Sequence, residues 1–344
     1  MKENKSELKI SDIGEFALIE RINKIVDKAF NPESIVCGIG DDTAVLSLPE
    51  SGYEMLVTCD SMVEGHHYLR QYISPVEIGR RAMVMNISDI GAMGGIPLYA
   101  LITLGLNPSE SVDDIEEIYK GFIIELEPFG AAIIGGNISK INGSSFIDIT
   151  LIGKVAKDCK VFRSGAMPGD AVMVTGCPGK SVAGYHIVSK GIRKLEQHKA
   201  LLDAYIRPHH RAKEGHALAM SGKITSMIDL SDGLSGDLFH ICEKSNVGVE
   251  IKEDMLPSCE AFDQVSSFFK KREIDFILGP SDDYELLFTC RPKDIEYIMR
   301  LLNKFDCPVT HIGRIVSPEH GISLIGTDGG KRPLLKRGWD HFAK

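Results

Sequence analysis

The sequence predicts a two-domain protein of the α/β or α+β class. Its 344 residues exceed the size at which a single hydrophobic core usually stops growing. In the second half, segments with strand character alternate with segments that carry a helical period. Residues 156–170 are polar and punctuated by glycine and proline, which favours a domain boundary near their start. We therefore expect one domain at 1–157 and a second at 158–344.

The composition is that of an ordinary globular protein, with 43% hydrophobic and 25% charged residues. The N-terminal segment is polar, and no apolar run approaches the roughly 18 residues that a membrane-spanning helix needs. The eight cysteines include no C-x-x-C pair, which fits reduced thiols better than a disulfide framework or a zinc site. We expect a cytoplasmic protein that does not insert into a membrane.

The formal net charge of −9, without any basic block, opposes binding to nucleic acid or to an anionic membrane surface. The same charge repels a ligand that carries phosphate groups, unless metal cations lie between the protein and the ligand. A phosphate-binding function therefore requires a site for cations.

The first half of the chain contains two helices with clear start and stop signals. Ser74-Pro75-Val76-Glu77 is a capping box with proline at the first helical position, and Gly94-Gly95 stops this helix. The second helix begins near Ser111 and ends before Gly130. The strands expected around them are 54–60, which ends on Asp60, a buried strand at 131–136 that leads into a loop, and 146–155, which alternates as a sheet strand.

Asp89 lies within the apolar stripe of the first helix. The stripe is formed by positions at the helical spacing i, i+4, i+7, i+11 and i+14, which are Ile78, Ala82, Met85, Asp89 and Ala92. A carboxylate in an apolar helix face is costly to bury, so Asp89 needs a compensating partner.

The second half of the chain has a mixed pattern of strands and helices. The expected strands are 171–176, 224–230 and 284–290, and the expected helices are 181–190, 210–220, 233–245 and 293–304.

Carboxylate side chains gather in several motifs, most of them where these elements begin or end. Asp41 and Asp42 follow a turn that Gly38 and Gly40 allow, and the chain then returns at once to apolar residues. The other members of this set are Asp60, Asp89, Asp229, Asp232, Asp282, Asp283 and Glu285. Oxygen ligands in this number are what Mg²⁺ prefers, and several such ions can neutralise a polyphosphate during phosphoryl transfer. For Asp41, Asp237 or Asp283 taken singly, a helix cap, a turn or a solvated charge is the better explanation.

The segment "TGCPGKSVAG" invites a P-loop interpretation, because Gly179-Lys180-Ser181 follows a strand and opens a helix. The P-loop requires a glycine five residues before Gly179, where this chain has Val174. We therefore interpret the segment as a tight turn between a strand and a helix.

No protein nucleophile stands out. Adjacent histidines on an extended segment point to opposite faces, so at most one of His66 and His67 faces a site. Trp339 is either a packing anchor or a stacking surface for a flat ligand. No Ser/His/Asp triad or Cys/His pair is recognisable, so in a phosphoryl transfer the nucleophile belongs to the substrate.

Several motifs together resemble those of the thiamine-monophosphate kinase family, which belongs to the superfamily of aminoimidazole ribonucleotide synthetase. They occur in the family's order and spacing from Gly14 to Phe342, and they are "GEFALIERI", "GIGDDTAVL", "TCDSMVEGHHY", "NISDIGAMGGIP", "GGN", "RSGAMPGD", "IDLSDGLSGDL", "DDYELLFT" and "GWDHF". The resemblance implies a two-domain fold in which the strands of the N-terminal domain pair across a homodimer into a barrel, beside a C-terminal α/β domain.

The implied reaction is transfer of the γ-phosphate of ATP to thiamine monophosphate, assisted by several Mg²⁺ ions. Residues that resemble the metal ligands are Asp42, Thr58, Cys59 through its carbonyl, Asp60, Asp89, Asp229 and Asp232. Residues that resemble nucleotide contacts are Tyr119, Gly136, Asn137, Arg163 and Ser231. Residues that resemble contacts with the thiamine substrate are His67, Asp282 and Trp339. On this interpretation magnesium offsets the charge of Asp42, and Asp41 braces the turn.

Two motifs depart from the family's pattern. Asn137 replaces the aspartate of the family's "GGD", and an amide offers one oxygen without charge. Asp282 replaces the glutamate of the family's "GGED" and is shorter by one methylene. Three hypotheses remain: a thiamine-monophosphate kinase, a relative that uses ATP on another small acceptor, and a nucleotide-binding protein without turnover.

Overall fold

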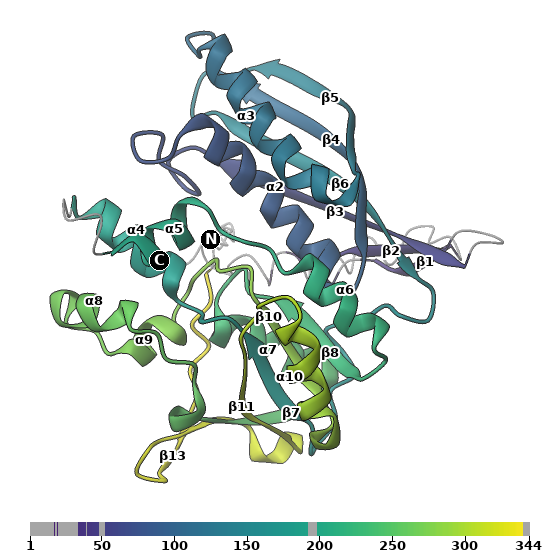
Figure 1. Cartoon of the computed structure of the whole chain (residues 1–344), viewed down its shortest axis with the longest axis vertical. Coiled ribbons are helices and arrows are strands. Elements are labelled where there is room, and N and C mark those ends of the chain that lie inside the picture. The colour runs from purple at the N-terminus through teal and green to yellow at the C-terminus, as the bar shows by residue number, and fades with distance from the viewer. Residues whose placement is uncertain are drawn as a thin grey trace, which may run out of the picture.

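Two β-sheets, one in each half of the chain, make up the fold of the computed structural model (Figure 1). The structure describes residues 34–38, 40–47, 52–191 and 198–339, together with the isolated positions 17 and 19. The motif "GEFALIERI", apart from two positions, and the last three residues of "GWDHF" lie outside the described residues. The two sheets and their helices confirm the predicted mixed α/β class.

The first half of the chain forms a six-stranded sheet, here called sheet A, whose strand order is β1-β2-β3-β6-β4-β5. Its strands are β1 (Ile35–Cys37), β2 (Ala44–Ser47), β3 (Tyr53–Val63), β4 (Ile96–Leu106), β5 (Ala132–Lys140) and β6 (Phe146–Ala156). Neighbouring strands are antiparallel except β4 and β5, which are parallel. The predicted alternation of β6 is confirmed, because every second residue of this strand is buried.

Helices α2 (Pro75–Ala92) and α3 (Val112–Leu126) pack together and cover one face of sheet A (Figure 1). The predicted capping box is present, since the carboxylate of Glu77 accepts a hydrogen bond from the backbone N–H of Ser74 at 3.2 Å. The chain leaves the second helix at Gly130, which has a left-handed φ of 65°. Both helix predictions are therefore confirmed.

The second half forms a seven-stranded sheet, here called sheet B, with the order β13-β12-β9-β11-β7-β10-β8. Its strands are β7 (Ala171–Thr175), β8 (Ile224–Asp229), β9 (Gly248–Lys252), β10 (Leu286–Cys290), β11 (Val309–Val316), β12 (Ile322–Ile325) and β13 (Lys331–Pro333). The helices are α4 (Lys180–Ser189), α5 (Lys199–Ile206), α6 (Ala212–Met220), α7 (Leu234–Ser245), α8 (Ala261–Phe269), α9 (Glu273–Ile277) and α10 (Ile295–Asn303). All predicted elements of this half are present, and the sequence prediction missed α5, α8, α9 and four strands.

Helix α2 lies between the two halves of the molecule. It packs against sheet A and α3 on one side and against α6 and β8 on the other. A Cβ atom at Gly91 would lie 2.5 Å from the Cα atom of Ala212, so this close approach of α2 to α6 requires glycine. The predicted stripe is buried or half-buried along its length, and burial extends beyond it, because α2 carries buried residues on nearly all sides.

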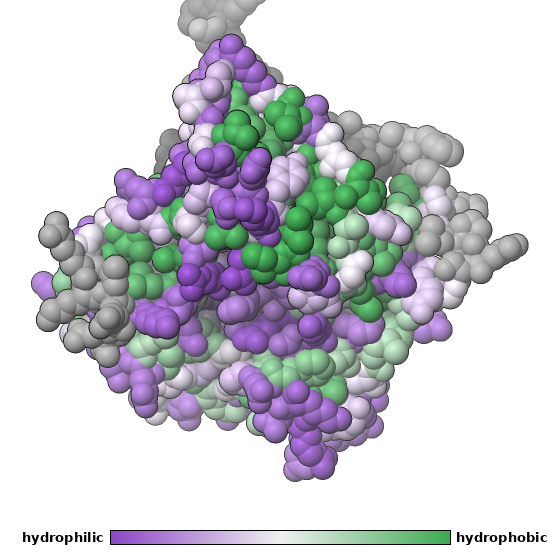
Figure 2. Space-filling view, turned by 45° about the horizontal axis from the view of Figure 1, so that its top comes forward, coloured by the Kyte–Doolittle hydropathy of each residue, from purple (hydrophilic) through white to green (hydrophobic). Residues whose placement is uncertain are grey.

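Strand β5 differs most from its prediction. We expected a buried strand at 131–136 followed by a loop, whereas β5 extends to Lys140 and is exposed along almost its whole length. It lies at the edge of sheet A, where β4 is its one partner among the strands that the structure describes. Ile134 and Ile138 are 55% and 65% exposed. Figure 2 shows hydrophobic surface on the part of the molecule that the N-terminal elements form.

Strand β3 also continues beyond its predicted end at Asp60. Its pairing with β6 is unbroken from Tyr53 opposite Ala156 to Val63 opposite Phe146, and this long ladder keeps Asp60 inside the strand. In the described part of the chain, no helix is long and apolar enough to cross a membrane.

Candidate metal and nucleotide site

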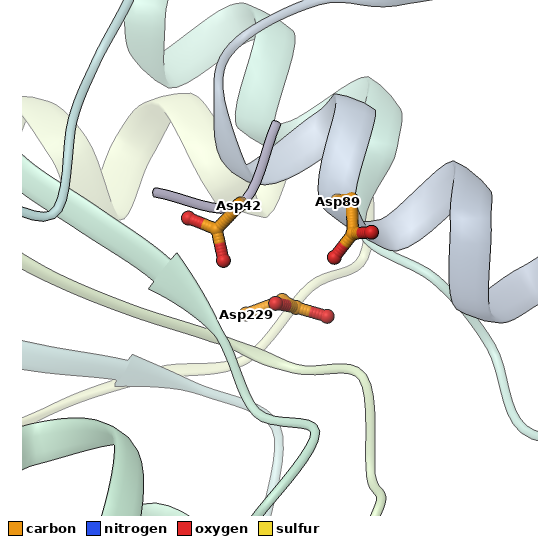
Figure 3. Close-up of side chains that lie close together, drawn as sticks. All are labelled: Asp42, Asp89 and Asp229. Atoms are coloured by element: carbon orange, nitrogen blue, oxygen red, sulfur yellow. The ribbon is translucent and has the colours of Figure 1, made fainter. Parts of the chain in front are cut away.

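Three aspartates from distant parts of the sequence meet where α2 lies against sheet B. Asp42 comes from the loop between β1 and β2, Asp89 from α2, and Asp229 from the end of β8. One carboxylate oxygen of each lies within 4.8 Å of the others, and Figure 3 shows the three side chains directed toward a common point. We call these three residues the aspartate triad. Its ligand type and spacing are suited to a hard cation such as Mg²⁺.

Local hydrogen bonds hold two members of the triad in place. The hydroxyl of Ser88 donates to Oδ2 of Asp229 at 2.6 Å, and the hydroxyl of Thr58 donates to Oδ2 of Asp89. The turn before Asp42 contains Gly40 at a φ of 126°, as the sequence predicted for a tight turn. The carboxylates are therefore positioned before any ligand arrives.

The protein leaves part of this charge uncompensated. Among the described residues, Oδ2 of Asp42 and Oδ1 of Asp229 are buried and have no hydrogen-bond partner. Burial, followed by repulsion from neighbouring carboxylates such as Asp42, raises the pKa of Asp89 and of Asp229 well above the ordinary value. Unpartnered buried carboxylate oxygens fit a bound cation, which would supply the missing partner.

Arg163 compensates part of the negative charge of Asp42, a partner that the sequence did not reveal. Its guanidinium donates to Oδ1 of Asp42 at 2.6 Å, and its backbone N–H donates to Oδ1 of Asp41 at 3.2 Å. Asp41 also accepts a hydrogen bond from the N–H of Asp42, so it braces the turn as expected. Burial, followed by repulsion from Asp42, raises the pKa of Asp41 to about 7.

The other predicted metal ligands surround the triad to different degrees. Asp60 lies close enough for its charge to raise the pKa values of both Asp89 and Asp229, after the larger effect of burial. Asp232 lies in the loop after β8, three residues beyond Asp229. The thiol of Cys59 points to the other face of sheet A, where it donates to Asp148 at 3.5 Å. Only the main chain of Cys59 is therefore available to the site.

Of the predicted nucleotide contacts, Arg163 adjoins the triad directly, and Ser231 is exposed in the loop after β8. Tyr119 packs edge-on against Phe122 of α3, with ring centroids 5.2 Å apart. Gly136 and Asn137 lie on the exposed strand β5, where the amide of Asn137 donates to Ser139 at 3.1 Å. None of the described contacts of these last three residues involves the triad.

Two of the predicted substrate contacts, Asp282 and Trp339, are connected to the site through the loop after β8. The carbonyl of Asp232 accepts hydrogen bonds from the N–H groups of Ser281 and Trp339, at 3.3 and 3.2 Å. Asp282 follows Ser281 directly, so Asp282 and Trp339 flank the same loop. The indole of Trp339 belongs to a side chain that is 49% exposed, so it is not a buried packing anchor.

The predicted geometry of the histidine pair is wrong. His66 and His67 lie in a turn rather than on an extended segment, because both of their N–H groups bond to the carbonyl of Val63. Nδ1 of His67 accepts a hydrogen bond from the N–H of Val63 at 3.0 Å.

The turn at Gly179 is occupied by a protein carboxylate. Asp283 accepts hydrogen bonds from the N–H groups of Gly179 and Ser181, at 2.5 and 2.9 Å. These are the groups at the start of α4 that a P-loop would offer to phosphate. The structure therefore supports the decision against a P-loop.

Two residues at the site were not found from the sequence. Ser88 orients Asp229, and Arg81 of α2 holds Asp282. A serine before an aspartate on a helix carries no signal of its own, and Arg81 pairs with a residue 201 positions away.

Comparisons with known proteins identify the family to which this chain belongs. The model of the AIR synthase related protein N-terminal domain matches residues 40–155, and that of the C-terminal domain matches residues 167–325. A thiamine-monophosphate kinase of Aquifex aeolicus is 33% identical over 97% of this chain and 100% of its own length. That of Bacillus subtilis is 30% identical over 93% of this chain and 98% of its own length. The chain belongs to the thiamine-monophosphate kinase family.

Solved structures agree with the assignment of this chain to the kinase family. The structure described as AaThiL complexed with AMPPCP and TMP has a TM-score of 0.84 and 31% identity, and the match covers 98% of this chain and 99% of that one. The hydrogenase maturation protein HypE in complex with ATP shares the fold, with a TM-score of 0.68 at 18% identity. The resemblance inferred from the motifs is confirmed.

Proposed function

We propose that this kinase phosphorylates thiamine monophosphate with ATP. An oxygen of the acceptor's phosphate attacks the γ-phosphorus in line, the bond to the leaving ADP breaks, and thiamine diphosphate forms. The observation that carries the proposal is the aspartate triad with its unpartnered buried oxygens, in a chain whose relatives are thiamine-monophosphate kinases. The AaThiL complex with AMPPCP and TMP supports both substrates.

The aspartate triad is suited to a divalent cation, and we propose that the site binds several Mg²⁺ ions. We propose Asp42, Asp89 and Asp229 as the central ligands, with Thr58, the carbonyl of Cys59, Asp60 and Asp232 completing the set. When bound, the ions neutralise the phosphates and the charge that develops during transfer. Without them the acidic site and the net charge of −9 would repel both substrates.

The side chains of this chain then bind and orient the substrates. We propose that Arg163, which donates to Asp42 in this structure, exchanges that bond for a phosphate oxygen of the nucleotide once cations share Asp42. We propose the remaining nucleotide contacts at Tyr119, Gly136, Asn137 and Ser231. We propose the acceptor contacts at His67, Asp282 and Trp339, of which the last two flank the loop at Asp232. No protein nucleophile is needed, because the acceptor phosphate supplies it.

We further propose a cytoplasmic homodimer built through sheet A. The exposed edge strand β5 and the exposed side chains of Tyr99 and Leu101, at 46% and 38%, form a surface that a second copy would cover. A barrel of strands from two protomers would also remove the open edge of the sheet. The domain division at 157/158 is supported by the gap between β6, which ends at Ala156, and β7, which begins at Ala171.

The test is incubation of purified protein with ATP, Mg²⁺ and thiamine monophosphate, followed by product analysis. We expect thiamine diphosphate and ADP in equal amounts, with ADP release that depends on the acceptor. A calorimetric titration with ATP runs beside it. Binding of ATP without turnover would show a degenerate nucleotide-binding protein, and turnover only with another small acceptor would show a changed substrate.

A further inference from the structure

The acceptor-side residue Asp282 is held by a buried arginine of the other domain. Arg81 of α2 is only 2% exposed, and Nη2 of its guanidinium donates to Oδ2 of Asp282. Nη1 donates to the carbonyl of Tyr205, and the guanidinium lies over the Tyr205 ring, 5.0 Å from its centroid. A planar guanidinium fixed on three sides leaves Asp282 little freedom.

The second oxygen of Asp282 is also fixed. The hydroxyl of Ser181 at the start of α4 donates to Oδ1 at 2.5 Å. The Asp282 side chain nevertheless remains 34% exposed, so it is accessible to a ligand while its position is set from behind. Two residues later, Tyr284 has a left-handed φ of 54°, an unusual conformation for a bulky residue that the surrounding contacts must maintain.

The same helix face that holds Asp282 also holds the metal side of the site. Arg81 and Ser88 are seven residues apart on α2 and therefore lie on one side of the helix. Ser88 donates to Asp229 of the aspartate triad, and Arg81 donates to Asp282. One rigid element thus sets the distance between the cation ligands and the acceptor-side carboxylate.

We propose that Arg81 is a positioning residue that determines which acceptor the kinase uses, by fixing how far Asp282 reaches into the acceptor site. The proposal rests on the proposed function. A fixed carboxylate at this point selects an acceptor that presents a cationic or N–H-bearing heterocycle, and thiamine monophosphate carries both a thiazolium ring and an aminopyrimidine. Lengthening the acid or shortening the base alone should mismatch the pair, whereas changing both together should restore the fit.

The experiment compares Arg81→Lys, Asp282→Glu and the double variant with the wild type. For each, the KM values for thiamine monophosphate and for ATP are measured separately, together with kcat. Loss of one charge-assisted hydrogen bond predicts that either single change raises the KM for thiamine monophosphate by about tenfold or more, with the KM for ATP nearly unchanged. The double variant should recover most of this loss.

Arg80→Lys is the matched control. Arg80 is the residue before Arg81 on α2, and it pairs with Glu125 of α3 at 2.6 Å instead of with Asp282. This variant should leave both KM values unchanged. Should Arg81→Lys fail to fold, Ser181→Ala removes the other bond to Asp282 without disturbing a buried charge, and it should raise the same KM by a smaller factor.

Equal rises in both KM values, a fall in kcat alone, or additive losses in the double variant would overturn the proposal and leave Arg81 a purely structural residue. Calorimetric titration of thiamine monophosphate, with Mg²⁺ and a non-hydrolysable ATP analogue, separates this result from failure of the proposed function. A wild type that binds the acceptor without turnover defeats the proposed function, and the variants' binding constants then decide the role of Arg81. A wild type that does not bind it defeats both.

Discussion

Two groups of buried aspartates differ in what satisfies them. Asp283 and Asp237 are surrounded by backbone donors: Asp283 receives the N–H groups of Gly179 and Ser181, and Asp237 receives that of Gly233 at 3.0 Å. In the aspartate triad, Oδ2 of Asp42 and Oδ1 of Asp229 are as deeply buried but have no partner among the described residues.

From this difference we infer that the first group serves folding, and we propose that the second serves cation binding. A buried carboxylate that accepts backbone hydrogen bonds stabilises the turn that provides them. A buried carboxylate without partners costs stability, and the protein retains it only if something else supplies the missing charge. Composition and position along the chain are similar in the two groups, so only the contacts distinguish them.

The largest effect is expected from Asp89→Asn. This change removes a proposed cation ligand and relieves repulsion among buried carboxylates, so it should reduce phosphoryl transfer by at least about 10²-fold while the protein stays as stable as the wild type or becomes more stable. Turnover and thermal unfolding without Mg²⁺ are measured on the same preparation.

Asp114→Asn on α3, a change to a side chain that is 44% exposed, serves as the control and should change neither quantity. Activity within a few-fold of the wild type in Asp89→Asn would exclude this residue from the site.

The opposite outcome is expected for Asp283→Asn. An amide would direct its NH₂ group or a weaker acceptor at two backbone donors, so the free energy of unfolding should fall by about 1–3 kcal/mol. Urea unfolding at neutral pH measures the change. A variant as stable as the wild type would remove the distinction between the two groups of aspartates.

The sequence predicted the residues of the triad but not the reason for their arrangement. Asp89 was recognisable because it interrupts an apolar helix pattern, and Asp229 because it ends a strand. The role of Arg163 as the counterion of Asp42 could not be recognised, because the two residues are 121 positions apart and no local pattern links them. Local periodicity encodes which face of an element is apolar, whereas ion pairs between domains depend on how the domains pack.

The exposed strand β5 is a second case in which a local sequence pattern did not predict the environment of an element. A run of apolar residues bounded by glycines looks the same in a buried strand and in an exposed edge strand. The sequence therefore predicted the strand and mistook its environment. Its polar continuation at Asn137 was taken for a loop, although Asn137 pairs with Thr103 in the ladder.

A buried histidine beside the site gives a smaller, pH-dependent effect. Burial, followed by repulsion from Lys336 and Arg163, lowers the pKa of His240 to about 3, against about 6.5 in an unfolded chain. Because the folded pKa is the lower one, the unfolded chain takes up the proton more readily. His240 therefore contributes stability that is present above pH 6.5 and is lost as the pH falls toward 3.

The free energy of unfolding of the wild type should accordingly fall more steeply than that of His240→Gln between about pH 6.5 and 4, by up to about 1.4 kcal/mol per pH unit. Urea unfolding at a series of pH values gives both curves. Parallel curves would mean that His240 takes up its proton in the folded protein as well. Burial of His240 would then carry no electrostatic cost, in contrast to burial of the triad.

The smallest effect is expected from Asn137→Asp. This change tests whether a carboxylate on the exposed strand β5 takes part in cation binding, as is proposed for the triad. If β5 faces the ions in the assembled enzyme, the added charge should lower the Mg²⁺ concentration for half-maximal activity by a few-fold, an amount typical of one exposed charge. The exposed Ser144→Asp, in the loop between β5 and β6, is the control for a general gain of negative charge. Equal Mg²⁺ dependence in wild type and Asn137→Asp would place β5 outside the site, since a carboxylate that water already satisfies gains nothing from a distant cation.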